Sequence, residues 1–425
     1  MGSLTQSSLE MLFPKENSTV VTFYNTLSWE KSEVVALPGC LTITDSSGAE
    51  IPQYCNGVHT YTQVTVPSMG YVTYQKSEGI TNTNPGVQVS DNSLENEMLS
   101  IKLDNNGIII SLFDKKLQRE MLEDGANRFL LFEDKPYLFD AWEISGYYRE
   151  TEAEAGRLLS RKITVDSGLY AEIEQVIEIG DSLISQRLSL SSQAHKVDIE
   201  CTVDWKEEKK LLKVQAIPDV HSHEATYEIQ YGSLKRPTHS NTSWEAAQFE
   251  VCAHRYADLS QPDFGFSICN TSKYGHYIKG NVMELSLLKS AVYPDPTSDR
   301  HSHNFTFSYV SHSGDVIEGG VQRIAHSLNS PLLLVDNREG AQHSYSMFSV
   351  DGSVEIETVK RSEDGTGVIV RLYETCGKES FVSLDCAEEY ADIRECDLLE
   401  RLEEPADIRQ LKFTPFQIRS FFLKN

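Results

Sequence analysis

The strongest constraint on the fold is a hydrophobic period of two residues, which recurs along most of the chain. Residues 99–114, LSIKLDNNGIIISLFD, alternate apolar and polar side chains, turn at Asn-Asn-Gly and then enter a second β-rich run. Successive side chains of a strand point to opposite faces, so this pattern predicts a β-hairpin with one buried face. Two further stretches repeat the design around Gly180-Asp181 and Asp364-Gly365. We therefore predict an all-β protein made of stacked antiparallel sheets.

Helical patterns are rare. One short helix is expected in SLTQSSLEMLF near the N-terminus, where Pro14 ends it. Its apolar residues have no evident partner in this chain. Polar stretches then divide the sequence into a small β-domain at 19–80, a large one at 87–335 and a C-terminal one at 340–425.

The charge balance excludes some partners. The chain has 63 acidic and 38 basic side chains, a net charge of -25. Such a field repels phosphate backbones and anionic headgroups, so we expect neither nucleic acid nor a membrane surface as a partner. The N-terminus lacks the basic and apolar regions of a secretory signal, and no apolar run is long enough to span a bilayer. A cytoplasmic protein is expected.

The eight cysteines are sparse for a chain of 425 residues, and no two are spaced as Cys-x-x-Cys. We expect buried free thiols in a reducing compartment rather than a disulfide framework or a zinc ribbon. They stand at positions 40, 55, 201, 252, 269, 376, 386 and 396.

Two His-Ser-His stretches are the only obvious metal-binding pattern. His221 and His223 form one pair, and His301 and His303 form the other. Residues i and i+2 of a strand share a face, so either pair could offer two imidazoles to one ion. No further ligand stands at a standard spacing, so no metal is expected in this chain. The glycine-rich phosphate loops and the Gly-x-Ser-x-Gly nucleophile elbow are also missing from the sequence.

Carboxylates beside aromatic residues point to a sugar as the ligand. In EDKPYLFDAWEISGYY, acidic side chains flank Trp142 and a Tyr-Tyr pair. Carboxylates accept hydrogen bonds from ring hydroxyls, and aromatic faces cover the C–H surface of a sugar. The alternative is that Trp142 belongs to the core and the acids are solvated. The acids concerned are Asp134, Asp140 and Glu143.

Four segments carry a resemblance to a known family. They are DAWEISGYY, YGSLKRPTHSNTSWEAAQFEVCAHRYADLS, YPDPTSDRHSHNFTFSYVSH and ECDLLER with LKFTPFQIRSFFL. Together they resemble the C-terminal half of glycoside hydrolase family 38 α-mannosidases, in particular the cytosolic and vacuolar type. The similarity runs in the same order over essentially the whole chain.

The resemblance also shows what this chain lacks. The family's catalytic domain carries zinc on a His-x-Asp motif, an Asp nucleophile and a later His-His-Asp segment. None of the twelve histidines here is followed two residues later by Asp, and no two are adjacent. The resemblance therefore implies a C-terminal β-region in which residues 1–18 are a remnant of a helical linker. Zinc and the retaining double displacement would belong to an N-terminal catalytic domain of the same polypeptide, and no catalytic residue is expected in this chain.

For the fold, the resemblance implies a large super-sandwich of the galactose-mutarotase type, flanked by smaller β-sandwiches. Loops of this region are expected to help shape the pocket for a mannose-containing oligosaccharide. The residues that the resemblance implies for this pocket are Asp140, Trp142, Arg236, Thr238, His239, Trp244, Asp299 and His303.

Two positions depart from the family pattern. Lys289 stands where relatives commonly have Arg, and Arg300 stands where they commonly have Gly. A planar guanidinium can hold a pair of hydroxyls in a way that an ammonium cannot, so a sugar contact by Lys289 is in doubt.

Two other functions stay open alongside an accessory region of an α-mannosidase. One is a free-standing carbohydrate-binding module. The other is a mutarotase-like epimerase that uses a His and a carboxylate as acid and base. A plainer view places Trp244 and His254 in the core, with only the loop facing sugar. Assembly into a homo-oligomer also stays open.

Overall fold

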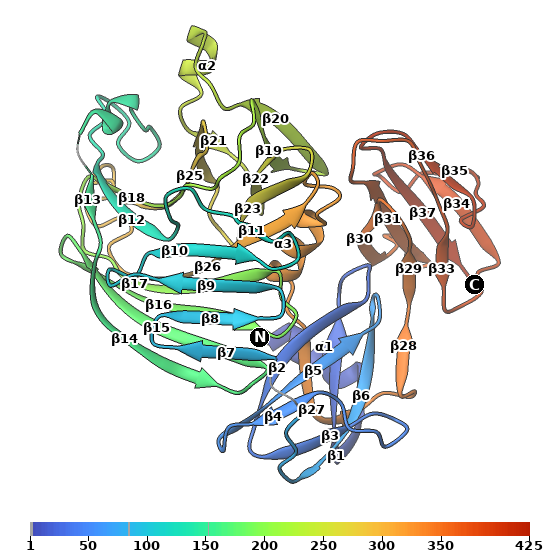
Figure 1. Ribbon diagram of the computed structural model, residues 1–425. Coiled ribbons are helices and arrows are strands. Elements are labelled where there is room, and N and C mark those ends of the chain that lie inside the picture. Colours follow the sequence, from blue (N-terminus) through green and yellow to red (C-terminus); the bar gives the residue numbers. More distant parts are fainter. Residues whose placement is uncertain (1–2, 84–85, 152) are drawn as a thin grey trace. The chain divides into compact units, whose positions relative to one another are not determined.

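The computed structural model describes residues 3–83, 86–151 and 153–425, which form two compact units (Figure 1). One unit comprises Met1–Thr83, Gln230–Ser233 and Ser330–Asn425, and the other comprises Asn84–Ile229 and Leu234–Asn329. Strands dominate both units, so the all-β prediction is confirmed. Among the described residues, no helix is both long and apolar enough to cross a membrane.

Three antiparallel sheets build the second unit. The largest has nine strands in the order β14 (Arg157–Asp166), β15 (Tyr170–Ile179), β16 (Ser182–Ser191), β17 (Lys196–Asp204), β26 (Ser302–Ser313), β23 (Phe264–Asn270), β22 (Tyr256–Ser260), β19 (Glu224–Ile229) and β20 (Gly232–Pro237). A six-stranded sheet has the order β13 (Glu154–Ala155), β12 (Arg128–Glu133), β18 (Lys210–Ala216), β25 (Val282–Lys289), β24 (Gly275–Lys279) and β21 (Val251–Cys252). A five-stranded sheet has the order β11 (Arg119–Glu120), β10 (Ile109–Asp114), β9 (Leu99–Leu103), β8 (Ser93–Asn96) and β7 (Val87–Ser90).

The core of this unit lies between the sheets because the strands alternate as the sequence predicts. Along β15, every second side chain is buried, including Ala171, Ile173 and Ile177. These side chains join one hydrophobic cluster with residues of the other two sheets. Strands β7 and β8 pack on β15 and β16, as the layers in Figure 1 show. The predicted hairpins at 99–114 and around Gly180 are both confirmed.

A glycine is required at the second of these turns. Gly180 has φ +56°, a conformation that costs an L side chain energy. A Cβ at this position would also meet the carboxylate of Glu207, which accepts hydrogen bonds from the Asp181 amide (2.7 Å) and the Ser182 hydroxyl (2.8 Å). The turn therefore fixes the register of β15 and β16.

The first unit contains the N-terminal and C-terminal segments, each with its own sheets. The N-terminal sheets are β27 (Leu333–Glu339), β1 (Lys15–Asn25), β6 (Gly70–Glu78) and β28 (Ser344–Ser346), with β3 (Leu41–Thr44) on β6, and β2 (Lys31–Pro38), β5 (His59–Val66) and β4 (Gln53–Cys55). The C-terminal sheets are β30 (Val354–Arg361), β31 (Val368–Glu374), β37 (Ile418–Lys424), β34 (Asp392–Cys396) and β35 (Leu402–Pro405), with the pairs β29 (Phe348–Val350) and β33 (Leu384–Cys386), and β32 (Ser380–Val382) and β36 (Leu411–Phe413). The hairpin predicted around Asp364-Gly365 is confirmed.

Four short helical elements complete the described part of the chain: α1 (Ser3–Leu12), the 3-10 helix η1 (Gly146–Glu150), α2 (Ser243–Ala247) and α3 (Val321–Asn329). The expected N-terminal helix is confirmed as α1. Its apolar residues do have partners, since Leu9 and Phe13 pack on Val335. Helix α3 was not expected, although its apolar residues Val321, Ile324, Ala325 and Leu328 recur at the helical spacing i, i+3, i+4 and i+7 and pack into one cluster.

Two elements cross the boundaries expected from the sequence. Strand β1 begins at Lys15, within the segment expected as a linker, because it pairs with β27 through Lys15 and Glu16. Strand β27 itself runs past position 335. It completes the sheet around β1 rather than the large domain, a long-range pairing that local composition does not reveal.

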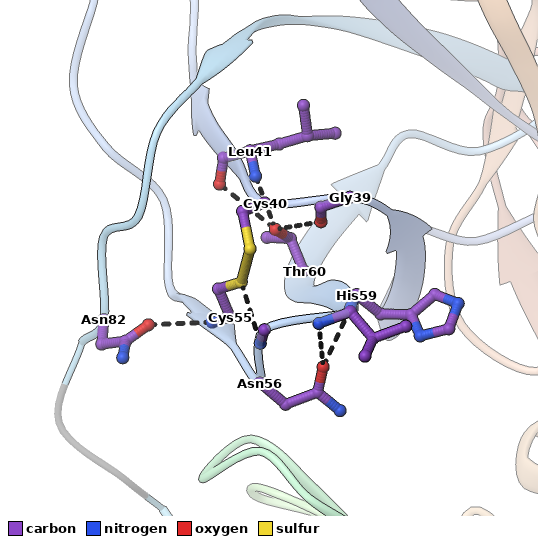
Figure 2. The surroundings of a disulfide bond; sticks show 10 residues. Gly39, Cys40, Leu41, Cys55, Asn56, His59, Thr60 and Asn82 are labelled. Atoms are coloured by element: carbon purple, nitrogen blue, oxygen red, sulfur yellow. Dashed lines mark hydrogen bonds between the residues drawn. A yellow bond between two sulfur atoms is a disulfide. The ribbon is translucent and has the colours of Figure 1, made fainter.

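The expectation that all eight cysteines are free is wrong for one pair. Cys40 and Cys55 form a disulfide (Figure 2), with Cα atoms 5.8 Å apart. Both lie beside the start of β5, because Pro38 pairs with His59 and Cys55 pairs with Thr60. Strand pairing therefore brings together two cysteines that the sequence separates by 15 positions. The other six are free, and Cys252 is exposed rather than buried.

The disulfide gives a first prediction. Replacing Cys55 by Ser should lower the free energy of unfolding of the oxidised protein by about 3 kcal/mol, because a crosslink of about 15 residues restricts the unfolded chain to that extent. Urea titration measures the loss. Cys252→Ser, at an exposed free thiol, is the matched control and should change stability by less than about 0.5 kcal/mol. Eight free thiols in the protein denatured without reductant would contradict the pairing.

Candidate functional site

The segment after β12 carries the aromatic side chains expected to face sugar. Trp142 is 68% exposed, and its ring stacks on Phe139 with centroids 5.6 Å apart and an interplanar angle of 21°. Tyr137 and Leu138 are exposed beside them. The six residues 137–139 and 142–144 line an open pocket. Trp142 is therefore not a core residue.

Two carboxylates fix this segment at its base. Asp134 is buried and ion-paired with Lys289. Burial raises the pKa of Asp134, although the ammonium of Lys289 opposes the shift. Asp140 Oδ2 accepts a hydrogen bond of 2.7 Å from the Val292 amide. Residues 140–144, which we name the DAWEI segment, are thereby joined to the loop between β25 and β26, which contains Asp299.

The second predicted group begins with Arg236 near the end of β20 and continues into the segment that follows. The guanidinium of Arg236 lies 4.7 Å from the ring centroid of Tyr227. Thr238 is buried and donates its hydroxyl to the Ser222 carbonyl at 2.6 Å. His239 Nδ1 lies 3.3 Å from the Glu245 carboxylate.

Helix α2 follows, and its N-terminus explains why so short a helix forms. Thr242 and Glu245 make a reciprocal capping box, in which each side chain bonds the backbone amide of the other residue. The cap holds Trp244 on the surface, where it is 83% exposed. His254 is half-buried against Tyr274. Neither residue is a core residue, so the expected placement of Trp244 and His254 in the core is wrong. In Figure 1, α2 and the segment between β12 and β13 both project beyond the sheets.

A buried polar network lies between these two groups. Lys213 on β18 has a side chain with no exposed surface. Its ammonium is ion-paired with Glu250 and contacts Ser286 Oγ at 3.1 Å. It also lies 3.6 Å from Glu284 Oε2. Glu250 belongs to the loop that follows α2, so this ion pair ties the Trp244 segment to the six-stranded sheet.

The other half of the network ties down the DAWEI segment. Arg149 on η1 binds the buried Glu284 carboxylate with two hydrogen bonds of 2.7 and 3.1 Å, and its guanidinium stacks 3.7 Å above the Tyr277 ring. Its neighbour Tyr148 donates a 2.5 Å hydrogen bond to Glu250. We name Lys213, Glu250, Glu284, Arg149 and Tyr148 the anchor network. It fastens both projecting segments to one sheet.

The surroundings shift the pKa values of two members of the anchor network, Glu284 and Tyr148. Burial would raise the pKa of Glu284, but the hydrogen bonds of Arg149 and the charge of Lys213 outweigh it and leave the pKa below its ordinary value. Burial and the Glu250 charge raise the pKa of Tyr148, so its hydroxyl stays protonated and donates. Nearby, His276 is neutral because burial and the charges of Lys213 and Arg236 lower its pKa to about 3.

Some buried polar atoms of this region have no hydrogen-bond partner among the described residues. They include both ring nitrogens of His276, Arg236 Nη1 and His239 Nδ1. Sequence reasoning named Arg236 but missed His276 and the anchor network. The available signal was Lys213 and Glu284 inside the otherwise apolar stretches LLKVQA and VMELSLL, because charged residues are buried in strands only when paired.

Among the residues that the structure describes, two groups of side chains could hold a metal ion. One comprises Asp299, His301 and His303, and the other comprises Glu123, Asp219 and His221. In each group, one ligand atom per residue lies within 4.8 Å of the others. The sequence predicted neither third ligand, since the loop conformation that turns Asp299 toward the histidines is not visible in residue spacing.

Two family models match the chain. The glycosyl hydrolases family 38 C-terminal domain matches residues 94–297, and the family 38 C-terminal beta sandwich domain matches residues 353–421. The chain belongs to glycosyl hydrolase family 38, and it corresponds to the C-terminal region of the family's proteins. The match to the first model contains the DAWEI segment, α2 and the whole anchor network.

Curated relatives agree with this assignment. The chain is 35% identical to alpha-mannosidase 2C1 of Mus musculus and 36% identical to that of Homo sapiens, each over an alignment of 421 positions that covers 94% of this chain and 39% of the relative. It is 31% identical to an alpha-mannosidase of Saccharomyces cerevisiae over 75% of this chain and 33% of the relative. The chain thus spans well under half the length of these relatives.

A solved structure confirms the fold. An alpha-mannosidase from Enterococcus faecalis superposes with a TM-score of 0.79 over 99% of this chain and 58% of that one, at 13% sequence identity. At that identity the match supports the architecture alone.

The anchor network gives a second prediction. Lys213→Met leaves the Glu250 and Glu284 carboxylates buried without a shared cation, so stability should fall by about 3–5 kcal/mol. Lys210→Met is the matched control, since Lys210 lies on the same strand and pairs with the half-exposed Glu133. It should cost less than about 1 kcal/mol. Urea unfolding measures both, and equal losses would show that burial does not make the ion pairs of Lys213 more important for stability than the ion pair of Lys210.

Proposed function

We propose that this chain is the accessory C-terminal β-region of a zinc-dependent, retaining α-mannosidase. It would complete the pocket for terminal α-mannosides and pack on an N-terminal catalytic domain of the same polypeptide. Membership of family 38 supports this role, as do the alpha-mannosidases among its relatives, of which this chain spans about two fifths. A cytoplasmic location is part of the proposal.

The single observation that carries the proposal is the exposed aromatic surface on an anchored base. Exposed side chains such as Trp142 and Phe139 cover apolar sugar faces well, since their rings are large and lose little conformational entropy on binding. Exposed apolar patches of this kind mark interaction sites. The anchor network holds the backbone beneath them, so the aromatic surface is formed before a sugar arrives.

The polar candidates fall into two roles within this proposal. Thr238 and Asp140 act as supports, because the Thr238 hydroxyl is committed to Ser222 and Asp140 Oδ2 to the Val292 amide. Arg236 Nη1 has no hydrogen-bond partner among the described residues, but the atom is buried, so a sugar hydroxyl would reach it only after the surrounding side chains shift. Asp299, His303 and His239 stay candidates for contacts with sugar hydroxyls. Trp244 offers a second aromatic face.

Enzymes of family 38 depend on zinc in general. The residues of this chain do not fit that catalytic site, because none of its histidines forms the His-x-Asp or His-His-Asp motif. We therefore assign no bond-making or bond-breaking step to this chain. Its part in the reaction is to bind and orient the sugar and to exclude water.

The proposal predicts that the 425-residue chain alone is inactive. Incubation with an aryl α-mannoside should release no phenol, with or without added zinc, since neither a nucleophile nor the catalytic zinc ligands are supplied. Release that scales with the concentration of the purified chain would overturn the accessory role. Saturable binding of free mannose in calorimetry at millimolar sugar would instead favour a stand-alone carbohydrate-binding module.

A fourth prediction concerns the polypeptide in which this chain follows a family 38 catalytic domain. There, Trp142→Ala should lower kcat/KM for an oligomannoside about tenfold, the loss of an aromatic contact worth about 1.4 kcal/mol. Phe381→Ala is the matched control, because Phe381 is an equally exposed aromatic on β32, outside the proposed pocket segments. Equal effects of the two substitutions would count against Trp142 as a pocket residue.

A further inference from the structure

Asp299, His301 and His303 lie together at the start of β26. His303 occupies the strand and pairs with Val203 of β17, while the His301 carbonyl accepts the Trp205 amide at 3.3 Å. Residues two positions apart on an extended chain point to the same side. Accordingly, the two imidazole rings stack with centroids 4.0 Å apart. Asp299, at φ +62°, turns its carboxylate back toward them.

Backbone carbonyls determine which ring nitrogens are available. His303 Nε2 lies 2.7 Å from the Asp299 carbonyl, and His301 Nδ1 lies 3.0 Å from the Ser302 carbonyl. A carbonyl oxygen only accepts, so each of these nitrogens carries a hydrogen and donates it. The opposite nitrogens, His303 Nδ1 and His301 Nε2, then keep their lone pairs. Histidine ligands of metals are oriented in this way, by donating the second ring N–H to a carbonyl.

We propose that Asp299, His301 and His303 bind one divalent transition-metal ion. Two imidazole nitrogens and one carboxylate oxygen, with water completing the shell, are a ligand set typical of Zn²⁺ and also suit Ni²⁺ and Co²⁺. The lone pairs of stacked rings lie in nearly parallel planes, so the side chains must rotate on binding for both nitrogens to face the ion. Because His301 and Asp299 are exposed, the ion enters from solvent.

The surrounding charges are compatible with a bound cation. The guanidinium of Arg300 is ion-paired with Glu208, so its charge is largely neutralised. Lys273 is the cation that opposes binding, since it acts electrostatically on Asp299 and lies over the neighbouring Phe305 ring at 4.6 Å. The net charge of -25 favours cations near the surface in general.

The group of Glu123, Asp219 and His221 is a comparison within the same molecule, and it contains only one of the two histidines of its His-Ser-His stretch. Its carboxylates are already engaged, since Glu123 accepts a hydrogen bond from Asn281 and Asp219 binds Arg119 at 2.9 Å. A metal there would have to displace an arginine. We therefore expect binding at the Asp299 group alone.

Calorimetric titration of the 425-residue chain with Zn²⁺ tests the site, in a Cys252→Ser background that removes an exposed thiol. One ion per chain should bind, and His301→Ala, His303→Ala or Asp299→Asn should each weaken binding more than about tenfold, because even outer-shell changes cost about 10–100-fold. His221→Ala should leave the affinity unchanged. Lys273→Met should tighten binding by removing the opposing charge. Co²⁺ absorption bands lost in the same three variants would identify nitrogen and oxygen ligation.

Absence of saturable Zn²⁺ binding would overturn the proposal, as would loss of binding in His221→Ala with retention in His301→Ala. The altered residues are exposed or half-buried, so unchanged urea midpoints separate lost ligation from lost folding. The inference shares Asp299 and His303 with the proposed sugar pocket, but the titration contains no sugar and measures no turnover. Failure of either proposal therefore leaves the other to be judged by its own experiment.

Discussion

The ammonium of Lys213 lies inside the six-stranded sheet, where no water reaches its side chain, and its charge must be met by the protein. Removing such a charge from water costs several kcal/mol, so the position is tolerable only if carboxylates are delivered to it. One is Glu284 on the adjacent strand. The other is Glu250, which comes from the loop after α2, and Tyr148 of η1 donates to the same carboxylate. The charge of a single strand residue thus requires two distant loops to fold back onto the sheet. Their projecting tips, with Trp142 and Trp244, are positioned as a consequence.

The alternation of apolar residues was enough to predict the sheets. In a strand, every second side chain points to the same face, so an alternating pattern buries all its apolar side chains together when the strand pairs in a sheet. The hairpins at 99–114 and around Gly180 follow directly from that stripe and from their turn residues. Pairings between remote strands are different in kind. The pairing of β1 with β27 joins strands that are more than three hundred positions apart in the sequence. The residues around Lys15 and Glu339 contain no local pattern that predicts it. The Cys40–Cys55 disulfide was missed for the same reason, since it arises from where β5 places its two neighbours.

For the candidate site, the sequence was informative about residue types and silent about their surroundings. Trp142 beside acids suggested a sugar surface, and the structure does expose the ring. Thr238 looked equally suitable, yet its hydroxyl is buried and already bonded to Ser222. Which polar side chains are committed to the backbone depends on loop geometry, which residue spacing does not encode. Lys213 and Glu284 did leave a trace in the sequence, as charges that interrupt apolar strands.

Charge and exposed apolar surface together narrow the class of ligand. A net charge of -25 opposes the approach of phosphorylated or carboxylated molecules over distances of about 8–10 Å, the range set by salt screening. Contacts to aromatic rings act only at close range and do not depend on the net charge. The field therefore favours a neutral ligand with apolar faces and hydroxyls, which agrees with the mannoside that we propose for Trp142 and Trp244. The same field raises the local concentration of cations near Asp299, where we propose that two imidazoles bind one ion. The acidity of the chain thus favours both proposed ligands, for opposite physical reasons.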